Sequence, residues 1–146
     1  MIVKNSYLDF QAKFRLAELI ITETEHWIWS IRPSQVTVGA GILSIKRAIE
    51  SFSELTESES LDLGKIIKII ERTSKETFVY NRINYLMLMM VDFQVHFHVI
   101  PRYNHEINFL GMTWKDKGWP AQPFLDAEVV SDDILFAIRD NLKQNL

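Results

Sequence analysis

The residues best suited to chemistry are two histidines separated by one position. His96 and His98 lie in residues 94–100, where polar and apolar residues alternate until Pro101. This alternation predicts a β-strand, and a spacing of two places both imidazoles on one face, roughly 6.5–7 Å apart along the backbone. Gln94 continues the same row. Two imidazoles and an amide on a rigid strand form a polar surface that can bind an anion.

The spacing alone leaves two other interpretations open. A His-x-His pair on a strand can simply face solvent. It can also bind zinc, which in enzymes commonly takes three protein ligands, and in a chain without cysteine the third would be His26, His105 or a carboxylate. A cupin-type barrel would need a glutamate four or five residues after the second histidine, where this chain has Arg102 and Tyr103. We therefore predict no metal site.

Length and composition limit the class of protein. The chain has 146 residues, of which 47% are apolar and 24% charged, with a formal net charge of -3. These values indicate one folded domain over residues 1–146 and argue against a nucleic-acid polymer as partner. The absence of cysteine excludes thiol nucleophiles and disulfides. Without a signal-peptide-like start or about 18 consecutive apolar residues, we expect a cytoplasmic protein that does not bind membranes.

The elements that must position the histidines can be placed from the apolar pattern. Residues 25–31 alternate and residues 42–45 form a second short apolar run, so both are expected as strands. Thr56 and Glu59 fit a capping box at the start of the clearest helix. Residues 84–91 are almost continuously apolar, which predicts a central strand covered on both faces.

Three further segments complete the expected α+β fold. Residues 14–21 are predicted as a short helix. Residues 103–124 contain two glycines and two prolines and are predicted as loop. A last helix over about 131–146 is expected to begin at Ser131 or Asp132, both of which favour helix starts.

Residues 94–103, which read QVHFHVIPRY, resemble the motif of the histidine triad (HIT) family, His-φ-His-φ-His-φ-φ with φ apolar. Similarity to bacterial members that resemble diadenosine polyphosphate hydrolases extends to residues 42–47, 53–56, 84–86 and 109–120. The resemblance covers most of residues 20–120.

The resemblance implies a five-stranded antiparallel sheet with packed helices, a homodimer, and a nucleotide held over the histidine strand. The substrate would be a dinucleoside polyphosphate or a nucleoside phosphoramidate. His96 would attack the α-phosphorus to give a nucleotidyl-histidine intermediate that water hydrolyses, without a metal or other cofactor. His98 would donate hydrogen bonds to phosphate oxygens. A neutral imidazole whose other ring nitrogen is hydrogen-bonded is a good nucleophile near pH 7.

The first histidine of the motif is replaced by Gln94, an amide that binds phosphate but cannot carry charge or exchange a proton at neutral pH. A positioning role would survive this change with a modest loss of rate, whereas a proton-transfer role would lose on the order of a hundredfold. Met89 and Met90 stand where many members have an amide that contacts phosphate or leaving group. The alternative hypothesis is therefore a nucleotide-binding module of the same fold with weak or no catalysis.

Three more residues are expected to bind substrate. Arg102 follows the motif and could steer phosphates. Gln35 lies with Arg32 in the loop after the aromatic strand, where HIT proteins usually bind ribose and base. Trp29 could stack on a purine, although core packing is the alternative for at least one of Trp27 and Trp29.

Overall fold

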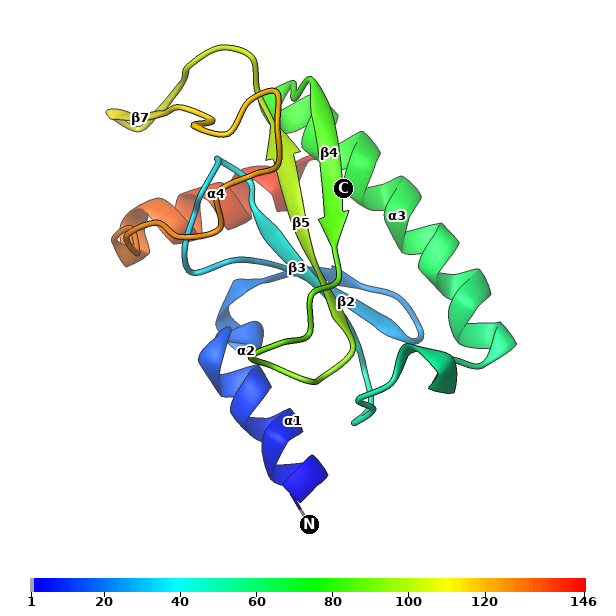
Figure 1. Cartoon of the computed structure of the whole chain (residues 1–146). Coiled ribbons are helices and arrows are strands. Elements are labelled where there is room, and N and C mark those ends of the chain that lie inside the picture. Colours follow the sequence, from blue (N-terminus) through cyan, green and yellow to red (C-terminus); the bar gives the residue numbers. More distant parts are fainter. Residues whose placement is uncertain (1) are drawn as a thin grey trace.

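Five antiparallel strands form the central sheet, in the order β1-β2-β3-β5-β4 (Figure 1). Their bounds are β1 Ile20–Glu23, β2 Trp27–Ile31, β3 Gly41–Ile45, β4 Arg82–Leu86 and β5 His96–Arg102. This computed structural model describes residues 2–146. The sheet confirms the α+β fold with about five antiparallel strands, and β5 lies inside it between β3 and β4.

Helices cover the two faces of the sheet unequally. The long helix α3 (Glu57–Phe78) and the last helix α4 (Asp132–Gln144) pack on one face and contact β1 and β2 (Figure 1). The opposite face carries the N-terminal helix α1 (Ile2–Lys13) and the single turn α2 (Leu16–Leu19). A 3-10 turn, η1 (Phe52–Glu54), precedes α3, and a small hairpin, β6 (Ile107–Phe109) and β7 (Met112–Trp114), lies outside the sheet.

Helix α3 begins as its sequence predicts. The Glu59 N–H donates to Thr56 Oγ1 at 3.1 Å, and the Thr56 N–H donates to the Glu59 carboxylate at 2.9 Å. This capping box satisfies two of the main-chain N–H groups that a helix start leaves without partners. Ile66 and Ile70 then project from α3 into the core, where both are fully buried.

Strand alternation divides the sheet into a core face and a polar face. On β2, Trp27, Trp29 and Ile31 are fully buried among the side chains of the main hydrophobic core. Ser30 lies between them in sequence and faces the other way, in register with Ile42 of β3, which is in register with His98 of β5. The histidine row therefore occupies the face that α1 covers.

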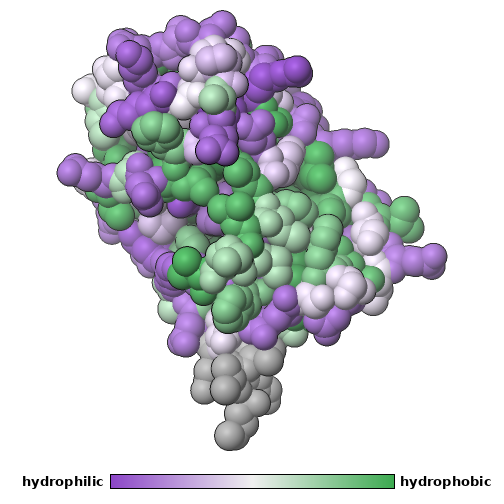
Figure 2. Space-filling model, viewed as in Figure 1, coloured by the Kyte–Doolittle hydropathy of each residue, from purple (hydrophilic) through white to green (hydrophobic). Residues whose placement is uncertain are grey.

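The apolar run over residues 84–91 is not a central strand. Its strand, β4, ends at Leu86 and lies at the edge of the sheet, so the prediction is wrong in both length and position. Met89 adopts a left-handed backbone with φ 52°, which no strand can contain. Met90 and Val91 are exposed rather than covered on both faces. The surface of this connection contributes to the apolar region in the lower half of Figure 2, so apolar composition here does not indicate burial.

Two further predictions differ from the structure. The short helix expected over 14–21 is instead the end of α1, the turn α2 and the start of β1, because Arg15 takes a left-handed conformation with φ 51° that ends α1. The segment 103–124, predicted as loop, contains the β6–β7 hairpin. Among residues 2–146 no helix combines the length and apolar character needed to cross a membrane.

Candidate active site

Strand β5 presents His96 and His98 on one face of the sheet, as their spacing predicts. Their neighbours across β3 are Ser44 and Ile42, respectively. The two imidazole rings meet edge to face with centroids 5.1 Å apart. Because β5 is paired on both sides, its backbone fixes where the rings point.

The His96 ring is oriented by a main-chain hydrogen bond. Its Nδ1 lies 2.5 Å from the carbonyl oxygen of Gln94. A carbonyl can only accept, so the imidazole carries its proton on Nδ1 and keeps the lone pair on Nε2. Burial lowers the pKa of His96, which keeps the ring neutral near pH 7. The geometry prepares Nε2 to act as a nucleophile.

His98 is held neutral more strongly. Burial lowers its pKa to about 4, and the nearby charge of Arg32 and the neighbouring His96 act in the same direction. Its Nδ1 is buried and has no hydrogen-bond partner among the described residues. An unpaired buried polar atom of this kind is usually satisfied by a ligand or ordered water.

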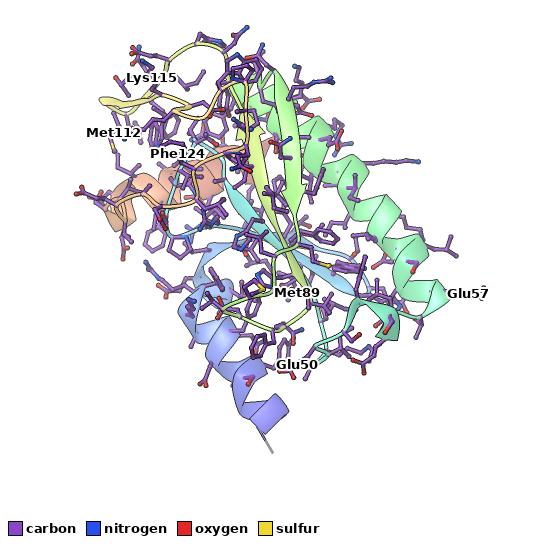
Figure 3. All side chains as sticks on the ribbon, viewed as in Figure 1. Glu50, Glu57, Met89, Met112, Lys115 and Phe124 are labelled. Atoms are coloured by element: carbon purple, nitrogen blue, oxygen red, sulfur yellow. The ribbon has the colours of Figure 1, made fainter. Side chains whose placement is uncertain are left out.

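A cavity of about 290 Å³ lies over the two histidines. This volume is at the low end for small-molecule sites. The lining side chains come from α1, the end of β2, the β4–β5 connection, β5 and the segment before α4: Lys13, Phe14, Arg32, Leu88, Met89, Met90, Val91, Asp92, His96, His98, Leu125 and Asp126. Figure 3 shows Met89 beside the α1 and α2 region, where the β4–β5 connection passes.

Helix α1 covers the histidines from outside. The Phe10 ring centroid is 4.8 Å from that of His96, and Phe14 lies 6.1 Å from His96 and 6.3 Å from His98. Lys13 Nζ bonds the Asp92 carboxylate at 2.7 Å and so joins α1 to the β4–β5 connection. As a result His96 is only 2% exposed.

Solved structures share this architecture. One histidine triad protein from Sinorhizobium meliloti is 22% identical, with a TM-score of 0.71 over 90% of this chain and 93% of that one. Another, from Marinobacter aquaeolei, is 19% identical, with a TM-score of 0.69 over 90% and 92%. The chain has the histidine triad fold. A third structure with this fold, a hypothetical histidine triad nucleotide-binding protein from Sulfolobus tokodaii, is 16% identical, with a TM-score of 0.66 over 87% and 82%.

Comparison of the sequence alone finds fewer similar proteins than comparison of the fold. No family model matches it, and no curated protein matches it. The likeness to histidine triad proteins therefore rests on the fold and on the motif in residues 94–100, and not on overall sequence similarity.

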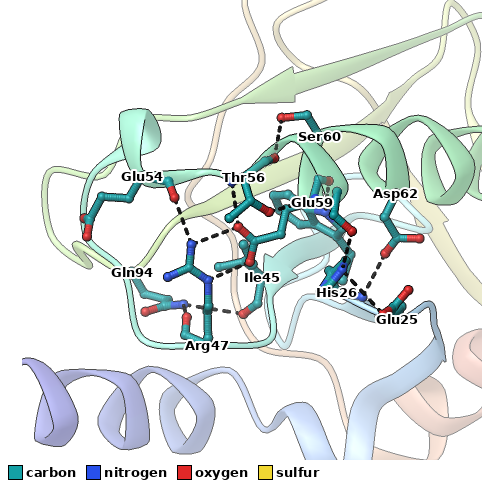
Figure 4. A network of polar contacts seen from close by, with 12 residues as sticks. Glu25, His26, Ile45, Arg47, Glu54, Thr56, Glu59, Ser60, Asp62 and Gln94 are labelled. Atoms are coloured by element: carbon teal, nitrogen blue, oxygen red, sulfur yellow. Dashed lines mark hydrogen bonds and ion pairs between the residues drawn. The ribbon is translucent and has the colours of Figure 1, made fainter.

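Gln94, at the first position of the motif, turns its side chain toward the backbone of β3. Its amide Nε2 donates to the Arg47 carbonyl at 2.6 Å and more weakly to the Ile45 carbonyl at 3.4 Å (Figure 4). Arg47 in turn pairs with Glu59 at 2.6 Å. The Gln94 side chain thus braces the sheet beside the site, while its main-chain carbonyl serves His96.

The structure separates Arg102 from the histidines. Its guanidinium is buried and pairs with Asp116 at 2.6 and 3.1 Å, with Asn84 at 2.8 Å and with the Ala121 carbonyl at 2.7 Å. It lines a different cavity, of about 840 Å³, between β4 and residues 119–123. Its donors hold the segment after β5 against the sheet, and the expectation that they steer phosphates stays a prediction.

The side chains of Gln35 and Trp29 pack or bond within the protein, away from the cavity over the histidines. The Gln35 amide donates to the Arg32 and Ala40 carbonyls at 2.7 Å each and accepts from the Gly39 N–H at 2.9 Å, so it braces the β2–β3 loop. Trp29 is fully buried in the core on the face away from the histidines. Neither side chain lines the cavity over the histidines, and the expected contacts of Gln35 and Trp29 with substrate stay predictions.

Three residues in or beside the cavity are not among the expected site residues: Phe14 and Arg32, which line it, and Phe10, which packs on His96. Phe10 and Phe14 are four positions apart, which places them on one helix face, and this spacing is the signal that could have revealed their joint role. Arg32 was grouped with Gln35 in the loop after β2, yet only Arg32 reaches the cavity. Within residues 2–146 no three His, Asp or Glu side chains are arranged to hold a metal.

Proposed function

We propose that the protein is a nucleotidyl hydrolase or transferase in which His96 attacks the α-phosphate of a dinucleoside polyphosphate or a nucleoside phosphoramidate. The observation that carries this proposal is the hydrogen bond from His96 Nδ1 to the Gln94 carbonyl. It directs an unprotonated Nε2 away from the strand, which is the state that a nucleophilic imidazole requires.

The proposed reaction has two displacements at one phosphorus. A bond forms between His96 Nε2 and the α-phosphorus while the bond from phosphorus to the leaving oxygen or nitrogen breaks. The leaving group departs with the electron pair and takes up a proton. Water then attacks the same phosphorus and the N–P bond breaks, which gives nucleoside monophosphate and neutral imidazole while the attacking water releases a proton to solvent. Each barrier is lower than that of direct hydrolysis.

A nucleotide substrate is supported by the fold and by the polar groups over the sheet. The Sulfolobus tokodaii structure is described as a nucleotide-binding protein. His98 carries a buried ring nitrogen without a protein partner among the described residues, and it adjoins the nucleophile. A phosphate oxygen would satisfy it. No metal or other cofactor is required by this chemistry, and that independence stays a prediction.

The replacement of the first motif histidine is compatible with catalysis. The atom that orients His96 is the carbonyl of residue 94, which glutamine supplies as well as histidine does. The amide itself is occupied by the Arg47 carbonyl. This geometry supports an orienting role at position 94, for which the expected loss of rate is modest.

Intact mass spectrometry after rapid mixing tests the proposal. The protein is mixed separately with diadenosine tetraphosphate and with an adenosine phosphoramidate and quenched without acid, because phosphorus–nitrogen bonds to imidazole are acid-labile. Wild type is expected to gain one adenylyl group or to release AMP steadily. His96→Ala is expected to do neither while still binding AMP. Turnover by His96→Ala at the wild-type rate would refute the proposed nucleophile.

A second candidate function is nucleotide binding without turnover. It is favoured by one observation: Phe10 covers His96, which is only 2% exposed. Calorimetric binding of AMP without any adenylylated protein or AMP release from either substrate would support this candidate over the first. Loss of turnover on adding a chelator would instead indicate metal-dependent chemistry.

The assembly is also a proposal. Strand β4 lies at the edge of the sheet, so its outer main-chain groups are available for pairing with another copy. We expect a homodimer, and light scattering that gives the monomer mass at micromolar concentration would refute it. The cytoplasmic location expected from the sequence stays a prediction.

A further inference from the structure

Arg32 is a buried cation in the wall of the histidine cavity. It follows β2 directly and is only 8% exposed. Its main chain is fixed: the N–H donates to the Ala40 carbonyl at 2.8 Å, and its carbonyl accepts from Gln35 Nε2 at 2.7 Å. A fixed backbone and a buried side chain leave the guanidinium little freedom to turn out to solvent.

The guanidinium is poorly satisfied by the protein. One nitrogen, Nη2, donates to the Leu125 carbonyl at 3.2 Å. The other two, Nε and Nη1, are buried and have no hydrogen-bond partner among the residues that the structure describes. Leaving a buried charged donor unpaired is unfavourable, so a binding partner is expected at these two nitrogens.

Arg102 shows what a structural arginine looks like in the same chain. It is equally buried, and its guanidinium is paired with Asp116, Asn84 and the Ala121 carbonyl. Arg32 has no such carboxylate bond within residues 2–146. The negative charge of Asp126 raises the pKa of Arg32, but burial lowers that pKa more, and Asp126 is exposed so that water screens its charge.

The neighbours of Arg32 indicate which ligand would satisfy it. His96 and His98 line the same cavity, and the charge of Arg32 contributes to lowering the pKa of both. Both imidazoles are neutral near pH 7, and Gln94 is an amide. Lys13, the other cation of the cavity wall, is already paired with Asp92. The positive charge that a phosphoryl group needs therefore has to come from Arg32.

We propose that Arg32 binds the phosphate group of the substrate, with its Nε and Nη1 donating to phosphate oxygens beside His96 and His98. Two N–H groups of one guanidinium match two oxygens of one phosphate. This inference rests on the proposed function in placing a phosphorylated substrate in the cavity. It adds a cationic residue, held by the β2–β3 loop, that would stabilise charge on the oxygens while His96 attacks.

Calorimetry with three probes tests the inference: inorganic phosphate, AMP and adenosine. The variants are Arg32→Gln and Arg32→Lys, with Arg72→Gln on the exposed side of α3 as the control. Arg32→Gln is expected to weaken AMP about 10- to 100-fold, as loss of charge-assisted hydrogen bonds does, and to leave adenosine unchanged. Arg32→Lys keeps the positive charge but lacks the planar guanidinium, so its AMP affinity is expected to lie between those of wild type and Arg32→Gln. Arg72→Gln is expected to behave as wild type.

The outcomes separate this inference from the proposed function. Phosphate or AMP binding that depends on Arg32, without turnover, supports the inference and refutes the enzyme. Turnover of diadenosine tetraphosphate with equal kcat/KM in wild type and Arg32→Gln overturns the inference and leaves the enzyme. Equal AMP affinity in wild type and Arg32→Gln also overturns it. If thermal denaturation shows that Arg32→Gln is unfolded, Arg32→Lys takes its place in the test. An AMP affinity of Arg32→Lys equal to that of wild type would then overturn the inference.

Discussion

His96 Nδ1 and the Gln94 carbonyl set the protonation of the proposed nucleophile. Burial lowers the pKa of His96 below its usual 6.5. Because the pKa is lowered, half of the His96 rings become protonated at Nε2 only at a pH below 6.5. We expect kcat/KM for diadenosine tetraphosphate to reach half its maximum at a pH below 6.5. A profile already half-maximal at or above pH 6.5 would contradict this.

The side chain of Gln94 is expected to affect stability more than chemistry. Gln94→Ala removes the donor to the partly buried Arg47 carbonyl, which should lower the free energy of unfolding by about 1 kcal/mol. The carbonyl at position 94 is retained, so the rate of adenylylation in a single turnover should fall far less than in His96→Ala. Urea denaturation and quench-flow measure the two effects. An adenylylation rate as low as that of His96→Ala would show that the amide itself acts in the reaction.

Helix α1 covers His96, and we expect it to limit the access of reagents to the imidazole. Phe10→Ala removes the ring packed against the imidazole, and we expect faster acylation of His96 by diethyl pyrocarbonate, which is read by peptide mass mapping. Because Phe10 is buried, the free energy of unfolding should fall by about 3 kcal/mol.

Leu8→Ala is the matched control for this change. Leu8 lies on the same helix but is 63% exposed, so neither acylation nor stability should change appreciably. Equal acylation rates in wild type and Phe10→Ala would mean that α1 does not limit access to the imidazole.

The elements that the sequence predicts well are those whose pattern agrees with their burial. Strands β2 and β5 alternate because one face packs on the core, and Thr56 and Glu59 mark the start of α3 by their own hydrogen bonds. The β4–β5 connection does not fit its apolar pattern, because four of its apolar side chains are exposed: Leu88, Met90, Val91 and Phe93. Helix α1 has weak amphipathic character, and its burial depends on Phe10 meeting a strand 86 residues later in the chain.

The same reasoning explains the site. The positions of His96 and His98 follow from strand period alone. The roles of Trp29 and Arg32 depend on which face of β2 is buried and on where the β2–β3 loop turns, which tertiary packing decides. A sequence pattern contains no information on the distance between Arg32 and a strand more than 60 residues away.

For the whole molecule, the histidines of β5 and Glu59 make stability depend on pH in separate ranges. The pKa of His98 is lowered to about 4 in the folded chain. Between pH 6.5 and 4, His98 is therefore protonated in the unfolded chain but not in the folded one. Stability is full above pH 6.5 and falls through that range by up to about 3 kcal/mol. The hydrogen bond from Arg47 lowers the pKa of Glu59 to about 2, so its contribution is lost only between 4.5 and 2.

Urea denaturation at pH 7, 5.5 and 4 measures this dependence. The wild-type midpoint should fall steadily over these values, and His98→Asn, which cannot titrate, should show a smaller fall. A His98→Asn slope equal to that of wild type would show that His98 is not the group responsible.

The main-chain origin of the bond to His96 bears on how such a chain tolerates mutation. Every amino acid has the same main-chain carbonyl, so a substitution at position 94 can alter the packing beside Arg47 without changing the tautomer of His96. Position 96 has no such latitude, since only its own ring can supply Nε2. Under the proposed mechanism, a chain of this fold that lacks the first histidine of the motif is therefore still expected to be active, whereas one that lacks the second is not.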